Sequence, residues 1–216
     1  LMNIHLVALF HSEDLKKYGF EPVLKPLIDD LKILETEGIQ LPFSATPVKG
    51  SVIQVIGDNL ALHALFGFVE SFSATYCCRL CLTAKSEYQS VFSEDHPGLT
   101  LRSKDLHVEH VRVIQENPAL KSTFGVKRDC PLNSLQFFHS SNNYAVDIMH
   151  DLLEGVVQYE LKLVFQYLIK NSISLSSLSE RIVSFNYGYT QRKNRPGGLK
   201  LDDNSKDLGL NAIQSW

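Results

Sequence analysis

The sequence has 216 residues, and 21 lysine and arginine residues stand against 24 aspartate and glutamate residues, so the formal net charge is −3 with histidine neutral. Hydrophobic residues make up 44%, aromatic residues 10% and charged residues 21%. This ordinary globular composition excludes an intrinsically disordered chain, a collagen-like repeat and a coiled coil. The slightly acidic balance also excludes a DNA-binding domain that works by positive charge alone. The length allows one large domain, or one domain with an insertion.

Strand and helix patterns alternate in the first 70 residues. Ile4–Phe10 is rich in β-branched and aromatic residues and predicts a buried strand. Pro22–Glu37 repeats apolar residues at three- and four-residue steps, which predicts an amphipathic helix. Ile39–Phe43 and Val48–Ile56 read as extended segments, and Leu60–Glu70 reads as a helix. This order predicts an α/β fold.

The middle and last parts of the sequence differ from the first. Residues 71–143 are mostly short polar loops with one predicted helix, Lys104–Asn117, and we expect an insertion with little core of its own. Tyr144–Asn171 carries a wide apolar stripe and has the strongest helix pattern. Another helix is expected over Leu175–Phe185, followed by a flexible basic loop over Gln191–Gly198.

The four cysteines are Cys77, Cys78, Cys81 and Cys130. Three of them lie within five positions, a spacing that is poor for a secreted disulfide framework and normal for a metal or thiol site. No apolar run is long enough to span a bilayer, and no signal-peptide pattern is present. We therefore expect an intracellular location and no membrane partner. Because the sequence opens in a strand-like run and closes in the first turns of a helix, we also expect a fragment of a longer protein.

The pair Cys78-x-x-Cys81 has a spacing at which two thiolates can reach one Zn²⁺, but a tetrahedral site needs two more ligands. A redox role is less favoured, because the motif does not begin a helix after a strand. Incidental buried cysteines are the alternative interpretation. The candidates for the missing ligands are His107, His110, Cys130 and His139.

Asp58 stands at the carboxyl end of a predicted hydrophobic strand. Ligand-binding and catalytic groups collect at that end of the strands in open α/β sheets, and a carboxylate is a ligand that Mg²⁺ prefers. The same carboxylate is also suited to cap the following helix, whose first amides need an oxygen acceptor. Taken alone, the position of Asp58 favours the helix-capping interpretation over a catalytic or metal-binding role.

Asp147, His150 and Glu154 stand at i, i+3 and i+7 and share one face of a predicted helix. Acidic residues early in a helix complement its dipole, which explains Asp147 and Asp151 without a function. Polar side chains on an otherwise apolar helix must be paired, bound to a metal or directed into a cleft. One interpretation is therefore a hydrolase that uses Asp147, His150 and Glu154 around a metal.

Four elements occur in a particular order: Gly57-Asp58-Asn59-Leu60-Ala61-Leu62-His63, Gly67-Phe68, Cys78-Arg79-Leu80-Cys81 and Asp147-Ile148-Met149-His150-Asp151-Leu152-Leu153-Glu154-Gly155. This order resembles transposase-derived proteins of the CACTA (En/Spm-like) type over residues 1–190. That family is similar to other DDE/D transposases, including the Transib group and the V(D)J recombinase catalytic subunit. The resemblance implies an α/β fold with a partial RNase H-like core, a mixed sheet with flanking helices, interrupted by a mostly helical insertion that contains cysteine and histidine. We expect the core portion at 1–70, the insertion at 71–143 and a helical segment at 144–216 that continues beyond the chain end.

The resemblance also implies roles for two acidic residues. Asp58 would be the second catalytic acid, while the first would precede Leu1. Glu154 is a candidate for the last acid, ranked below a glutamate farther downstream. Together the acids would hold catalytic Mg²⁺ or Mn²⁺.

The same resemblance makes Cys78 and Cys81 the thiolate half of a structural Zn²⁺ site. Asp147 and His150 match the family's D-x-x-H element and are grouped with the metal ligands. The histidines that complete the zinc site typically lie downstream of the last residue of this sequence.

The function predicted from the sequence is the central fragment of a transposase-like core that cleaves and joins DNA strands by phosphoryl transfer, incomplete or inactive alone. The alternative is a domesticated, catalytically dead, zinc-stabilised interaction module. DNA is the expected partner of the full-length protein in the nucleus, with Arg192, Lys193 and Arg195 as contacts, and a homo-oligomer is compatible with the resemblance. The charge of −3 does not contradict a DNA partner, because an acidic phosphoryl-transfer centre recruits metal first.

Overall fold

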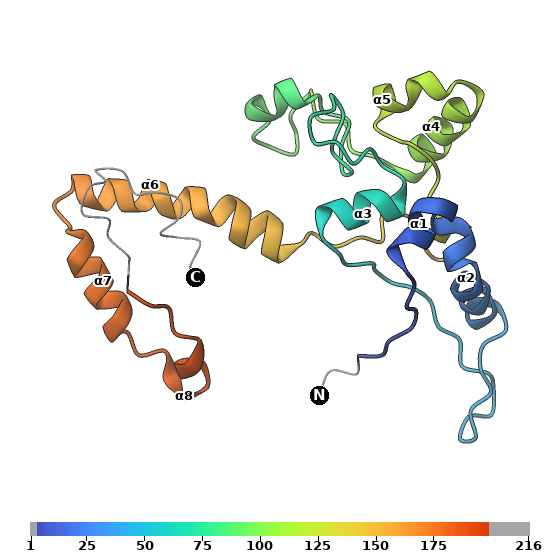
Figure 1. Ribbon diagram of the computed structural model, residues 1–216, viewed down its shortest axis with the longest axis horizontal. Coiled ribbons are helices and arrows are strands. Elements are labelled where there is room, and N and C mark those ends of the chain that lie inside the picture. The colour runs from blue at the N-terminus through green and yellow to red at the C-terminus, as the bar shows by residue number, and fades with distance from the viewer. Residues whose placement is uncertain (1–3, 199–216) are drawn as a thin grey trace. The chain divides into compact units, whose positions relative to one another are not determined.

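The computed structural model describes residues 4–198, and the elements drawn there are helices (Figure 1). Backbone contacts divide the chain into two units, of which the first ends at Ala145 and the second begins at Val146. No helix among the described residues combines the length and the apolar character needed to cross a bilayer. The elements are α1 (Ser12–Tyr18), α2 (Phe20–Thr36), α3 (Asn59–Phe66), the 3-10 turn η1 (Lys85–Ser90), α4 (Lys104–Glu116), η2 (Pro118–Leu120), α5 (Lys121–Phe124), η3 (Pro131–Ser134), the π-helix η4 (Ile148–Val156), α6 (Val157–Lys170), α7 (Leu175–Ser184), α8 (Gly188–Gln191) and η5 (Arg192–Asn194).

The predicted α/β fold with a mixed RNase H-like sheet is wrong for the described residues. Ile4–Phe10 takes no regular structure, and Leu9 is 86% exposed. Val48 and Val55 each form one isolated bridge, to Ile39 and Tyr144 respectively. A β-branched run supplies strand propensity, but a strand also needs a neighbour that accepts its backbone hydrogen bonds and covers one face. These segments have the strand propensity, but within residues 4–198 no neighbouring strand pairs with them along their length.

Most predicted helices are confirmed. Helix α2 matches the predicted Pro22–Glu37, α4 matches Lys104–Asn117 and α7 matches Leu175–Ser184 within the predicted Leu175–Phe185. Helix α3 ends at Phe66, before the predicted Glu70, because Gly67 turns left-handed at φ +79° and its N–H donates to the His63 carbonyl. Glycine adopts this conformation without the steric cost that other residues meet.

The core of the first unit joins α2, α3 and α4 to the segment that follows α5. Phe66 has no exposed surface, and Val126, from the far side of the cysteine-containing region, has none either. Residues 71–143 therefore share one core with α2 and α3. The buried members are Leu24, Ile28, Leu62, Phe66, Phe68, Val111, Ile114, Val126, Cys130, Leu132, Leu135 and Phe138.

Candidate functional site

The first candidate site is the cysteine loop, residues 76–83, which is held in place by backbone pairing with the segment before α4. Cys81 and Leu101 form an antiparallel bridge, and the Arg102 amide donates to the Leu80 carbonyl at 2.8 Å. Inside the loop, the Leu80 amide donates to Cys78 Sγ at 3.3 Å. All four cysteines are free thiols. The loop therefore presents Cys78 and Cys81 from a fixed backbone.

The two thiols of this loop influence each other's ionisation. A hydrogen bond from Cys78 lowers the pKa of Cys81 to about 5, and the Thr83 hydroxyl and amide stabilise the same thiolate. That hydrogen bond, together with burial, raises the pKa of Cys78. These effects favour the thiolate on Cys81 over the thiolate on Cys78. The thiolate is the form of cysteine that binds metals.

A buried arginine contacts the backbone of the cysteine loop. Arg102 is only 7% exposed, its Nε donates to the Cys78 carbonyl at 3.0 Å, and its guanidinium lies 5.1 Å from the centre of the Phe68 ring. Burial lowers the pKa of Arg102, while the charges of Cys78 and Cys81 raise it. The positive charge in turn helps to lower the pKa of Cys81. Arg102 is thus the counter-charge of the thiol pair.

The neighbouring Cys77 has a different environment. Its sulfur lies 3.4 Å from the hydroxyl of Tyr88 in η1. Burial, followed by the hydrogen bond to Cys77, raises the pKa of that phenol. Cys77 is therefore hydrogen-bonded to Tyr88, and we do not count it among the candidate metal ligands.

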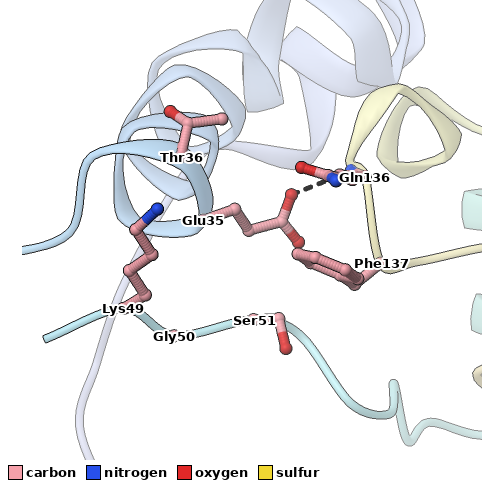
Figure 2. A pocket seen from close by; sticks show the side chains of 7 residues that line it. All are labelled: Glu35, Thr36, Lys49, Gly50, Ser51, Gln136 and Phe137. Carbon is pink, nitrogen blue, oxygen red and sulfur yellow. Dashed lines mark hydrogen bonds between the residues drawn. The ribbon is translucent and has the colours of Figure 1, made fainter.

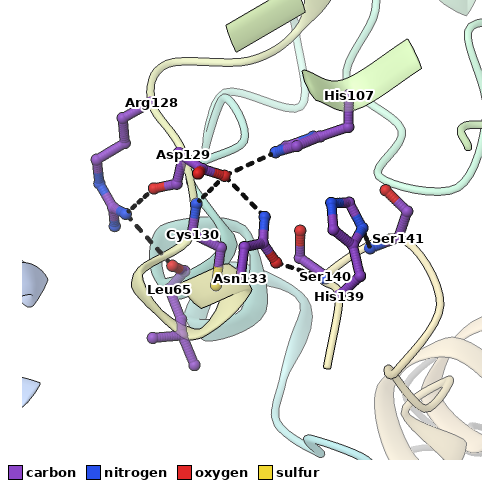
Figure 3. A network of polar contacts seen from close by, with 9 residues as sticks. All are labelled: Leu65, His107, Arg128, Asp129, Cys130, Asn133, His139, Ser140 and Ser141. Atoms are coloured by element: carbon purple, nitrogen blue, oxygen red, sulfur yellow. Dashed lines mark hydrogen bonds and ion pairs between the residues drawn. The ribbon is translucent and has the colours of Figure 1, made fainter. Parts of the chain in front are cut away.

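Two of the histidines considered as further metal ligands, His107 and His139, belong to a polar network in the core (Figure 3). His107 Nε2 lies 3.3 Å from Asp129 Oδ1, which also accepts the Cys130 amide at 2.8 Å and the Asn133 side-chain amide at 2.7 Å. The His139 ring lies edge-on to that of His107, with 5.3 Å between centroids. This network fixes the turn that precedes η3, so it has a structural role.

None of these side chains completes a metal site with the thiol pair. Across residues 4–198, no group of three or more histidine, cysteine, aspartate or glutamate side chains is arranged to hold a metal ion. His110 instead stacks on Phe124, with ring centroids 4.2 Å apart, and burial lowers its pKa. The pair Cys78 and Cys81 thus supplies two sulfur donors, half of a tetrahedral set.

Asp58, the predicted catalytic acid, is the N-cap of α3. Its Oδ1 accepts the Ala61 amide at 2.7 Å. The next residue, Asn59, accepts a hydrogen bond from the guanidinium of Arg79, which lies between Cys78 and Cys81 in the sequence. The start of α3 and the cysteine loop are therefore connected, although twenty residues separate them.

Alanine in place of Asp58 is expected to lower the free energy of unfolding by about 1 kcal/mol, because the first turn of α3 loses its side-chain acceptor. Asparagine is an equally good N-cap, so Asp58→Asn should unfold within a few tenths of a kcal/mol of wild type. Urea denaturation followed by circular dichroism measures both values. Equal destabilisation by the two substitutions would contradict the capping role.

Asp147 is also an N-cap, at the start of η4 in the second unit. Its Oδ1 accepts the Met149 amide at 3.0 Å, and its Oδ2 lies 2.5 Å from His150 Nδ1. The contact with His150 lowers the pKa of Asp147. Residues 148–156 form a π-helix, so the α-helical spacing that predicted a shared face with Glu154 does not apply. Glu154 is exposed, and Asp58 belongs to the other unit.

The predicted basic contacts are exposed and accompanied by aromatic rings. Arg192 and Lys193 lie in η5, and Arg195 follows directly. Arg192 and Arg195 line a hollow of about 320 Å³ together with Tyr189, which is 94% exposed. Exposed arginines beside an exposed ring are groups that bind a phosphate backbone and stack on a base.

Comparisons with protein-family models, with curated proteins and with solved structures find no match for this chain. The chemistry of its sites therefore depends on the residues described above. The sequence did not predict Arg79 and Arg102 as functional residues. Arg79 could have been noticed from its place between the two cysteines, whereas Arg102 has no sequence signal because only folding brings it to the loop.

Proposed function

We propose that this chain is a zinc-stabilised interaction module of a transposase-derived protein, with Cys78 and Cys81 as two of the four zinc ligands. The observation that carries the proposal is the fixed backbone of the cysteine loop, in which the Leu80 amide is directed at Cys78 and Cys81 is paired with Leu101. Zn²⁺ accepts such thiolate pairs in tetrahedral sites. The remaining ligands would come from residues outside 4–198 or from a partner chain.

Bound zinc would act as a structural cross-link of the cysteine loop. Arg102 would balance the negative charge of the thiolates, and the Thr83 hydroxyl would hold the Cys81 sulfur. Groups around metal ligands tune affinity in this way. The measurement that tests the proposal is the zinc stoichiometry of the purified chain, compared with that of the Cys78→Ser and Cys81→Ser chains.

The contact between Arg79 and Asn59 joins two of the segments on which the transposase resemblance depends. These residues lie in two of the four sequence elements on which the resemblance depends, and the hydrogen bond joins those elements. Arg79 is only 7% exposed, so the contact belongs to the folded interior.

DNA binding is the second proposed function, as an activity of the nuclear full-length protein. The favouring observation is the hollow between Arg192, Arg195 and Tyr189 in the second unit. Single-stranded DNA binds to sites that combine positive charge with aromatic stacking. The net charge of −3 for the whole sequence requires such a local patch, because the average surface repels phosphate.

Reversal of the two arginine charges, in the variant Arg192→Glu with Arg195→Glu, is expected to weaken binding to a single-stranded oligonucleotide. Each lost phosphate contact should reduce the dependence of log K on log salt by about 1 or slightly less. Fluorescence anisotropy at several salt concentrations measures this slope. Lys25→Glu in α2 reverses a single charge outside this hollow and should leave the slope unaltered. Equal losses in both variants would overturn the proposed contact.

Strand cleavage remains a prediction from the resemblance. The residues present do not form the expected Mg²⁺ or Mn²⁺ centre, because no group of three such ligands is gathered within residues 4–198. The test is Mn²⁺-dependent nicking of plasmid DNA by this chain and by a version extended at both ends. Since Asp58→Asn preserves the cap and removes the charge, unchanged nicking by the extended Asp58→Asn protein would exclude a catalytic Asp58.

A further inference from the structure

A pocket of about 510 Å³ lies at the carboxyl end of α2, away from the cysteine loop (Figure 2). Three distant segments build it: Glu35 comes from the last turn of α2, Lys49 and Ser51 from the segment before α3, and Gln136 and Phe137 from the segment after η3. The Gly50 amide fixes the second segment by donating to the Leu34 carbonyl of α2 at 3.3 Å. The walls are thus held by the fold of the first unit.

The pocket contains a buried carboxylate that is only half satisfied. Glu35 is 5% exposed, and its Oε2 accepts the Gln136 amide at 2.8 Å. The other oxygen, Oε1, is buried and has no hydrogen-bond partner among the described residues. An unsatisfied charged oxygen in a buried position is costly, so such groups are normally paired. Oε1 is therefore the oxygen of the pocket lining that most needs a donor, and a ligand reaches it only when the pocket wall at the exposed Phe137 side chain moves aside.

The position of Glu35 in its helix is also electrostatically unfavourable. The carboxyl end of a helix carries partial negative charge and favours cations. The last turn of α2 contains no basic residue, and Glu35 places a carboxylate there. Natural proteins break such a local rule chiefly at functional sites. The helix end and the carboxylate together make this end of the pocket selective for a positive group.

An aromatic ring stands beside the carboxylate. Figure 2 shows the Glu35 carboxylate directed toward Gln136 and Phe137. The Phe137 side chain is 58% exposed, which leaves its ring accessible from the pocket. A planar guanidinium can stack on such a ring while it donates to a carboxylate, which a compact ammonium does less well. This combination favours guanidinium over ammonium.

We propose that this pocket binds a guanidinium group, with Glu35 Oε1 accepting its hydrogen bonds and Phe137 contacting its face. The group would belong to an arginine side chain of a partner protein or to a small free guanidine. Lys49, on the same pocket wall, limits the affinity because its ammonium repels a second cation.

The experiment titrates the ¹⁵N-labelled chain with N-acetyl-arginine amide and, separately, with methylguanidinium, while amide shifts of Gly50 and Gln136 are followed by NMR. Binding of N-acetyl-arginine amide is expected to weaken about tenfold or more in Glu35→Gln, because the charged acceptor is lost. Phe137→Ala should weaken it about threefold. Lys49→Gln should strengthen it. Glu37→Gln removes a nearby exposed charge and is the matched control, with affinity close to wild type.

Tighter binding of N-acetyl-arginine amide than of methylguanidinium would identify a protein side chain as the source, whereas equal binding would identify a small guanidine. The proposal is overturned if the wild-type chain shows no shifts, if Glu35→Gln binds as tightly as wild type, or if Lys49→Gln weakens binding. Far-UV circular dichroism of Glu35→Gln separates loss of the site from loss of the fold, and Phe137→Ala tests the pocket without touching the buried carboxylate.

Discussion

Serine in place of Cys78 or Cys81 is expected to abolish zinc binding by the purified chain. Either substitution removes one of the two sulfurs of the proposed site, and a serine hydroxyl does not replace a thiolate as a zinc ligand near neutral pH. Affinity should fall by more than about a hundredfold, since loss of supporting groups alone costs 10–100-fold. Zinc content by mass spectrometry, and competition with a colorimetric chelator, measure the loss.

The neighbouring cysteine provides a matched control for this experiment. Cys77 differs from Cys78 by one position, but its sulfur is hydrogen-bonded to Tyr88, so Cys77→Ser should retain zinc. Substitution of the counter-charge, Arg102→Gln, should weaken zinc binding by about 10–100-fold without eliminating it. A wild-type chain that contains no zinc after refolding with the metal, or equal losses in Cys77→Ser and Cys78→Ser, would contradict the assignment.

Alanine in place of Gly125 is expected to be the most destabilising single-methyl change near the site. Gly125 has φ +67°, and a Cβ there would overlap the backbone carbonyl oxygen of Tyr76 and lie 2.8 Å from Arg102 Nη2. Backbone atoms cannot rotate away, so the cysteine loop would have to move. The positive φ costs about 1–2 kcal/mol and overpacking adds about 1–3 kcal/mol. Urea denaturation should therefore show a loss of roughly 3 kcal/mol.

Gly19 is a control without the steric overlap, because a Cβ built there meets no atom within 4 Å; its backbone, at φ +79° and ψ 179°, is a different glycine-favouring conformation from that of Gly125, at φ +67° and ψ 19°. Gly19→Ala should thus lower stability through conformational strain and leave zinc affinity unchanged. Gly125→Ala should lower both quantities, since the Tyr76 carbonyl immediately precedes the cysteines. A Gly125→Ala chain with wild-type zinc affinity would show that the loop position does not depend on this contact.

Helix positions were predictable because their signals are local. Pro22–Glu37 and Lys104–Asn117 each bring apolar side chains to one face at every turn, and neither pattern needs knowledge of a distant residue. The predicted sheet failed for the opposite reason. Ile4–Phe10 has a strand-like composition, but pairing depends on what lies beside it, and the described residues supply no partner.

The candidate sites also differ in how far they depend on local sequence. The spacing of Cys78 and Cys81 predicted a thiolate pair, and the alternative reading of Asp58 as a helix cap is confirmed by its bond to Ala61. In contrast, the π-helical turn after Asp147 changed the face that its spacing implied. His107, considered as a metal ligand, instead contacts Asp129 in the core.

By itself, the sequence determined the helices α2, α4 and α7 and the cap alternative for Asp58, because each depends on residues a few positions apart. Tertiary structure alone decided that Arg102 lies behind the thiol pair and that Glu35 meets Gln136 across 101 positions. A buried charge becomes informative only when its partners are known, since the cost of burial and the need for a donor arise from distant segments that folding brings together.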